Sequence, residues 1–108
     1  MGQKNSDKLL GALGLCKKAG KLIVGFDAVA DAIRRGSAKL LVVTGDLSPK
    51  SAGRIEALAV EYKVRHLVIG AAMDDIERLL GKRAGILAIL DQGLAEVVAR
   101  QVVEEESV

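Results

Sequence analysis

The chain has 108 residues and a mass of 11.3 kDa, a length typical of one compact domain. Half of the residues are hydrophobic and 28% are charged, which supports a packed core and excludes a disordered or collagen-like chain. With one cysteine and one histidine, Cys16 and His66, the chain has too few ligands for a disulfide framework or a multi-ligand zinc site. We therefore expect no metal and no cofactor.

The charge is distributed unevenly along the chain. The formal net charge is +2, but three consecutive glutamates occupy residues 104–106. Residues 1–103 hold 16 basic and 11 acidic side chains, a net charge of +5, which favours a polyanionic partner. No segment approaches the roughly 20 apolar residues of a membrane span, and the polar N-terminus does not resemble a signal peptide. We expect a cytoplasmic protein with no membrane partner.

The first half of the chain predicts two helices, each followed by a strand. Asn5 or Ser6 can cap a helix that ends at Gly20, and a short strand at 22–24 follows. Gly25 turns the chain into a second helix, which Gly36 closes. A continuous apolar run at 39–43 predicts a strand that is covered on both faces.

The second half predicts three helices and two strands. Ser48 and Pro49 supply the N-cap and first-turn proline of the third helix. Its expected inward stripe is Ile55, Leu58, Ala59 and Tyr62. The remaining expected elements are a strand at 67–69, a helix from Asp74 or Asp75 to Leu80, a strand at 86–90, and a helix that Asp91 caps. This alternation predicts an α/β domain over 1–103 with helices on both sheet faces, followed by an acidic flexible tail at 104–108.

Four stretches together carry a family resemblance. They are Gly20-Lys21-x-x-x-Gly25, Arg35-Gly36-x-Ala38-Lys39-Leu40, Asp46-x-x-Pro49 and Leu80-Gly81-Lys82-Arg83. Their combination resembles the kink-turn RNA-binding superfamily of ribosomal proteins, and most closely its small bacterial YlxQ-like branch. The resemblance implies a three-layer αβα sandwich around a mixed four-stranded sheet. It also implies no catalysis and binding of structured RNA, with ribosomal RNA as one candidate.

The chain departs from this family at the turn into the second helix. Relatives read Gly-Thr/Ala-Asn-Glu there, with a lysine one helical turn later, whereas this chain has Gly25-Phe26-Asp27-Ala28 and Asp31. A guanine edge presents the acceptors O6 and N7, and an ionised carboxylate such as Asp27 can only accept. The loop before the last strand also looks shortened between Arg83 and Ile86.

The candidate RNA-binding residues fall in two stretches. Backbone N–H groups at the helix start after Gly25 can receive a phosphate beside Lys21, although Gly20 and Gly25 also suit simple turns. In the second stretch, Lys82 and Arg83 either bind phosphate or complement the negative end of the preceding helix. Lys17 and Lys18 either extend the patch at Lys21 and Gly25 or form the solvated face of the first helix. Phe26 stacks on a base or packs onto its own domain.

Three functions compete at this point. Non-catalytic binding of structured RNA leads, with Lys17, Lys18, Gly20, Lys21, Gly25, Phe26, Asp27, Lys82 and Arg83 as candidate binding residues. A protein-interaction module would use Asp27 and Asp31 as an acidic contact surface. A small-molecule enzyme would use strand-end residues such as Thr44, Asp46 and Asp91, but no plausible acid–base pair accompanies them.

Overall fold

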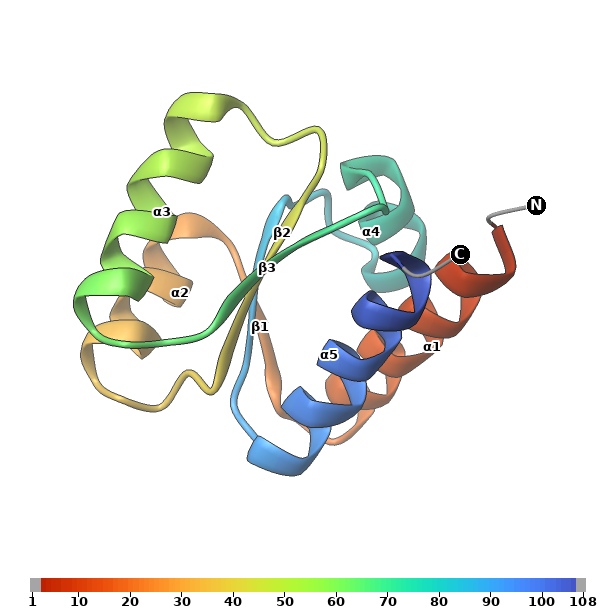
Figure 1. The fold of residues 1–108 in the computed structure, drawn as a ribbon, viewed down its shortest axis with the longest axis horizontal. Helices are drawn as coiled ribbons and strands as arrows, with labels where there is room; N and C mark the ends of the chain where they lie inside the picture. Colours follow the sequence, from red (N-terminus) through yellow and green to blue (C-terminus); the bar gives the residue numbers. More distant parts are fainter. Residues whose placement is uncertain (1–2, 107–108) are drawn as a thin grey trace.

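The structure is a computed structural model that describes residues 3–106, with side chains described for residues 7–104. Helices and strands alternate along this part of the chain (Figure 1). The elements are α1 (Gln3–Lys18), β1 (Leu22–Val24), α2 (Phe26–Arg34), β2 (Leu40–Thr44), α3 (Pro49–Glu61), β3 (His66–Ile69), α4 (Met73–Leu80), β4 (Ile86–Ile89) and α5 (Gln92–Glu106). Their order agrees with the sequence-based prediction.

The four strands form one mixed sheet in the order β1-β4-β2-β3. Strand β4 runs antiparallel to both of its neighbours, β1 and β2, whereas β2 and β3 are parallel. Every residue of β2 and β4 is buried, as expected for central strands that are covered on both faces. The sheet therefore matches the mixed four-stranded arrangement that the family resemblance implied.

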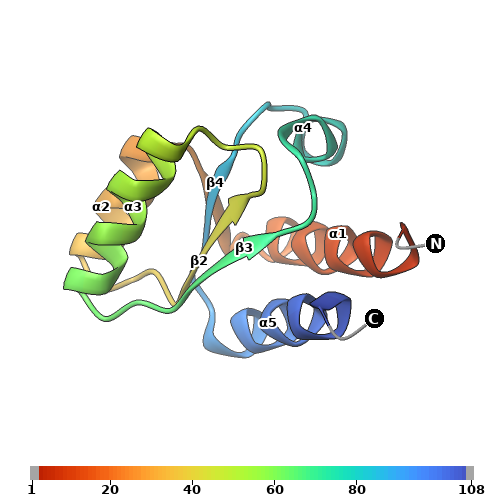
Figure 2. The same ribbon diagram turned by 45° about the horizontal axis from the view of Figure 1, so that its top comes forward.

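Helices cover both faces of the sheet and create two cores (Figure 2). Helices α1, α4 and α5 pack on one face, where the shared cluster includes Leu13, Val42, Leu87 and Val98. Helices α2 and α3 pack on the other face, where the cluster includes Ile33, Leu41 and Ile55. The predicted three-layer αβα sandwich is confirmed. None of the described helices is long and apolar enough to cross a membrane.

Several boundaries differ from the sequence-based prediction. Helix α1 begins at Gln3, so Asn5 and Ser6 lie within it and do not cap it. Helix α4 begins at Met73, and Asp75 accepts a hydrogen bond from the Ala72 N–H at 2.8 Å. The predicted inward position of Tyr62 is wrong, because Tyr62 follows the last turn of α3 and its side chain is 44% exposed.

The C-terminal boundary also differs. Helix α5 continues through Glu106, so the acidic residues expected to begin a flexible tail at residue 104 instead form the end of this helix. Helical hydrogen bonding and the burial of Val102 extend α5 beyond the last turn that the apolar residues of the sequence predicted. Residues 107–108 of the expected tail lie outside the described residues.

Candidate nucleic-acid interface

The turn at Gly25 and the loop before β4 meet at one end of the sheet. Because β1 and β4 are antiparallel, the end of β1 lies beside the start of β4, and Val24 pairs with Leu87. The Gly25 N–H donates a hydrogen bond to the Ile86 carbonyl at 2.9 Å. We call residues 25–28 and 81–85 the rim. Two segments that are far apart in the sequence therefore form one edge.

The first turn of α2 has no side-chain cap. Gly25 is its N-cap, with φ 99° and ψ 148°, a backbone conformation that is essentially restricted to glycine. No described side chain caps the N–H groups of this turn. The first N–H groups of a helix have no intrahelical acceptor, so those of residues 26–28 are available to an anion. The N–H of Gly25 itself is occupied by Ile86, which corrects its expected role as a donor.

The next three helices in the chain differ from α2 in this respect. Ser48 accepts a hydrogen bond from the Ser51 N–H at 3.3 Å at the start of α3. At the start of α4, Asp46 accepts from the Met73 N–H at 3.1 Å. Asp91 likewise accepts from the Leu94 N–H at 2.8 Å at the start of α5. Among helices α2 to α5, in the part of the chain that the structure describes, α2 alone begins without a side chain bonded to its N–H groups.

Tight packing fixes the loop between α4 and β4. The Thr44 N–H donates to the Gly85 carbonyl at 3.0 Å, which joins the loop to the end of β2. A Cβ atom on Gly85 would lie 2.9 Å from both Leu47 Cδ1 and Thr44 Oγ1. Glycine is therefore required here for close approach, and the loop has a defined position beside the α2 start.

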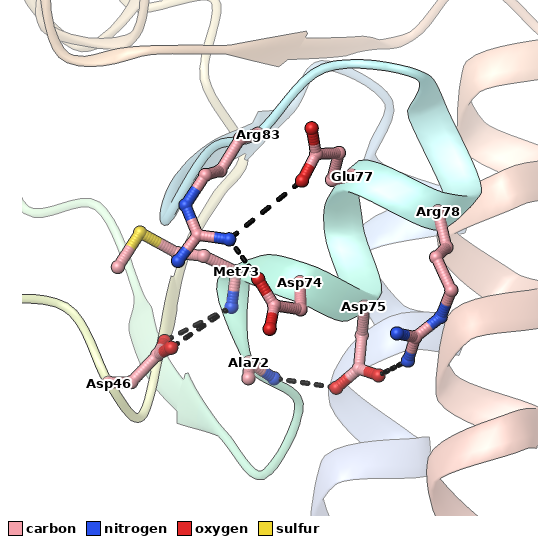
Figure 3. A network of polar contacts seen from close by, with 8 residues as sticks. All are labelled: Asp46, Ala72, Met73, Asp74, Asp75, Glu77, Arg78 and Arg83. Atoms are coloured by element: carbon pink, nitrogen blue, oxygen red, sulfur yellow. Dashed lines mark hydrogen bonds and ion pairs between the residues drawn. The ribbon is translucent and has the colours of Figure 1, made fainter.

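The two cations of this loop, Lys82 and Arg83, have different surroundings. Arg83 forms an ion pair with Asp74, and Glu77 lies 3.8 Å away from its guanidinium (Figure 3). The hydrogen bond and the charge of Asp74 raise the pKa of Arg83. Lys82 is exposed and forms no salt bridge with another described residue. Lys82 is thus the free cation of this described loop, whereas Arg83 would have to exchange partners to bind phosphate.

Asp46 links the end of β2 to the start of α4 (Figure 3). Desolvation raises the pKa of Asp46, but the Thr44 hydroxyl, the Met73 N–H and the charge of Arg83 outweigh it and lower the pKa overall. The Thr44 hydroxyl is buried and makes no hydrogen bond of good geometry within the described part of the chain. It therefore lowers the pKa of Asp46 by lying near the carboxylate and not through an aligned hydrogen bond. The Asp46 carboxylate therefore accepts a hydrogen bond at the start of helix α4 and is not an unpartnered acid–base group.

Lys17 and Lys18 end α1 beside this region. The Lys17 ammonium donates to the Leu80 carbonyl at 3.1 Å, across 63 positions of sequence. This bond places Lys17 at the C-terminal end of α4, next to the loop that contains Lys82. Lys18 is exposed at the end of α1. The contact with Leu80, the last residue of α4, therefore places the Lys17 ammonium beside the start of the rim loop at residue 81.

Gly20 and Lys21 lie at the other end of β1. The Leu90 N–H donates to the Lys21 carbonyl at 2.8 Å, which places Lys21 beside the end of β4 and not beside its start. Four residue steps along an extended strand separate Lys21 from Gly25 by about 13 Å. The expectation that Lys21 and the Gly25 helix start receive the same phosphate is wrong, because β1 runs between them.

Phe26 packs onto its own domain. Its half-buried side chain packs against the core between the sheet and helices α2 and α3. The Arg54 guanidinium lies 4.7 Å from the ring centroid, a cation–π distance. Arg54 is an exposed cation beside the rim that the sequence analysis missed, because no local pattern connects residues on two different helices.

The acidic residues of α2 face solvent. Asp27 is exposed in the first turn, where a carboxylate complements the positive end of the helix. Asp31 pairs with Arg35 at 2.9 Å, one turn later. No group of three potential ligands suited to a metal occurs among the described residues. Cys16 is buried, and this burial raises the pKa of its thiol.

Comparison with known proteins identifies similar sequences over most of the chain. Residues 7–99 match the model of the Ribosomal protein L7Ae/L30e/S12e/Gadd45 family. The RNA-binding protein YlxQ of Bacillus subtilis is 34% identical, over 77% of this chain and 83% of the relative. The large ribosomal subunit protein eL30B of Schizosaccharomyces pombe is 26% identical, over 91% and 86%. A solved structure of a protein of unknown function from Bacillus halodurans superposes with a TM-score of 0.82 at 23% identity, covering 89% of this chain and 97% of that one.

Proposed function

Because the chain belongs to the Ribosomal protein L7Ae/L30e/S12e/Gadd45 family, in its bacterial YlxQ-like branch, we propose that it binds structured RNA at the rim without catalysing a reaction. The observation that carries this proposal is the uncapped start of α2 beside the basic loop. Its free N–H groups and the helix dipole favour an anion there.

The rim residues have distinct roles in this proposal. A phosphate accepts hydrogen bonds from the N–H groups of residues 26–28, while Lys82 contributes a mobile positive charge. Arg54 adds a second cation beside Phe26. Arg83 reaches the RNA by exchanging Asp74 for a phosphate, a change between two charge-assisted contacts.

Asp27 limits how the protein can recognise the base sequence of an RNA. A carboxylate cannot donate to guanine O6 or N7, so recognition relies on the RNA backbone and shape. We therefore expect affinity to decrease steeply with salt, since phosphate contacts release counterions. Ribosomal RNA is the first cellular ligand to test, because a relative is a ribosomal protein.

The test is fluorescence anisotropy with three labelled RNAs of equal length: a kink-turn hairpin, a plain duplex and a single strand. We expect binding of structured RNA at low salt, and a loss of affinity in Lys82→Glu. Lys8→Glu is the matched control, because Lys8 is an exposed cation on α1 away from the rim. Equal failure with all three RNAs would overturn the proposal. Retention of a nuclease-resistant protein partner would then favour the protein-interaction alternative.

A further inference from the structure

A basic groove lies at the end of the sheet opposite the rim. It has a volume of about 400 Å³, and its lining comes from the segments that lead into β2 and β3 and from the first half of α5. The lining residues used below are Lys39, Tyr62, Lys63, Arg65, Gln92 and Glu96. We call this the far groove. A shallower depression of about 300 Å³ shares Arg65 and Glu96 with it and continues to Arg100.

Strand pairing fixes the position of the far groove. The Lys39 N–H donates to the Ile89 carbonyl at 2.8 Å, and the Leu41 N–H donates to the Arg65 carbonyl at 2.9 Å. Lys39 and Arg65 therefore lie directly before β2 and β3, at the same end of the sheet, and both line the far groove. Strand β2 then runs toward Gly45 at the rim end, an advance of about 20 Å from Lys39. One small RNA contact at the rim cannot occupy the far groove as well.

The far groove has more unpaired positive charge than the rim. Its lining includes the exposed cations Lys39, Lys63 and Arg65, and the adjoining depression includes exposed Arg100. None of these four side chains forms a salt bridge within the described part of the chain. Glu96 is the carboxylate that lines it, and it accepts a hydrogen bond from Gln92 Nε2 at 3.3 Å. By contrast, the rim cation Arg83 is already paired with Asp74. Several free cations from separate elements suit a polyanion.

The end of α3 adds two further features. Lys63 has φ 59°, a left-handed conformation that favours glycine at a helix end, yet a lysine occupies it. Tyr62, which precedes it, exposes 44% of its surface at the groove. A phenol ring beside these cations provides a stacking face for a base together with charges for phosphate.

We propose that the far groove binds the phosphate backbone of a second RNA segment, which rests on the proposed RNA-binding function and extends it. Lys39, Lys63 and Arg65 contact phosphates, and Tyr62 stacks on a base. An acidic peptide would match the charge but would not use the Tyr62 ring. The protein thereby contacts RNA at both ends of its sheet.

The test uses the full chain labelled with ¹⁵N and a single-stranded uridine dodecamer at low salt. We expect the backbone amides of Lys39, Lys63 and Arg65 to shift on titration, and to shift equally in Lys82→Glu. In Lys39→Gln/Lys63→Gly/Arg65→Gln these shifts disappear, and the slope of log affinity against log salt decreases by about 2, at roughly 0.7 per phosphate contact. Lys8→Gln is the control and keeps the full slope.

Lys63→Gly separates binding from folding. Glycine adopts the left-handed conformation freely, so this variant should keep the melting temperature of the parent while it binds the dodecamer more weakly. Unchanged affinity in Lys63→Gly and in the triple variant would overturn the inference.

The outcomes distinguish this inference from the proposed function. If rim amides shift with RNA and far-groove amides do not, only the second site is wrong. If no amide shifts with any RNA, RNA binding itself is wrong. Equal far-groove shifts with an oligoglutamate of matched charge would overturn the assignment to RNA and indicate an acidic protein segment.

Discussion

The backbone N–H of Gly25 donates to the carbonyl of Ile86 at 2.9 Å, and this bond joins the start of α2 to the loop before β4. It fixes two segments of the proposed RNA-binding rim in one arrangement before any ligand is present. Such preorganisation reduces the entropy lost on binding, because the binding groups are already ordered.

Gly25→Ala tests the backbone requirement of the rim. A Cβ at φ 99° and ψ 148° is strained even though no atom lies within 4 Å, so we expect the free energy of unfolding to decrease by about 1–3 kcal/mol. Urea denaturation measures this change. Gly11→Ala is the control, because Gly11 lies exposed within α1 with open space around it and should gain about 0.5–1 kcal/mol. Equal stability changes in the two variants would contradict the argument.

Asp74→Asn should strengthen RNA binding. It removes the negative charge that holds Arg83, whose guanidinium then becomes available to phosphate. The pair is largely exposed to solvent, so the loss of stability should be small. Anisotropy titrations should show higher affinity at low salt and a smaller difference at high salt. No gain in Asp74→Asn, together with unchanged binding in Arg83→Gln, would assign Arg83 a purely structural role.

Asp27→Asn should improve discrimination between RNAs. The amide supplies a donor that can reach guanine acceptors, which the carboxylate lacks. A good base contact contributes about 1–3 kcal/mol, so affinity for the kink-turn hairpin should increase about tenfold or more relative to the duplex. Competition binding with both RNAs measures this ratio. A parallel gain for both RNAs would indicate that only the repulsion of phosphate by Asp27 had been removed.

Asp46 predicts a pH dependence of stability. Its pKa in the folded state lies below the ordinary value of an aspartate, so its contribution is present above the unfolded-state pKa and is lost as pH falls through the folded pKa. Asp46→Asn should therefore destabilise the protein at neutral pH and cost progressively less under acidic conditions. Urea denaturation of both proteins across that range tests this, and a pH-independent difference would exclude the charged hydrogen bond as the cause.

Local sequence patterns determined the identity and order of the elements. The apolar run at 39–43 and the Ser48-Pro49 start each depend on neighbouring residues, and both elements form close to the expected positions. Helix ends were less accurate, since α1 begins before Asn5 and α5 continues through Glu106. Backbone hydrogen bonding can extend a helix beyond its apolar stripe, which the pattern does not register.

The tertiary structure alone decided which residues share a surface. Strand pairing places Lys21 beside Leu90, while Arg54 and Phe26 meet across two helices. The fold also pairs Arg83 with Asp74 and brings Lys39 and Arg65 into the lining of the far groove. These contacts join residues distant in sequence, and they follow from the packing of the whole sheet, which short-range periodicity does not encode.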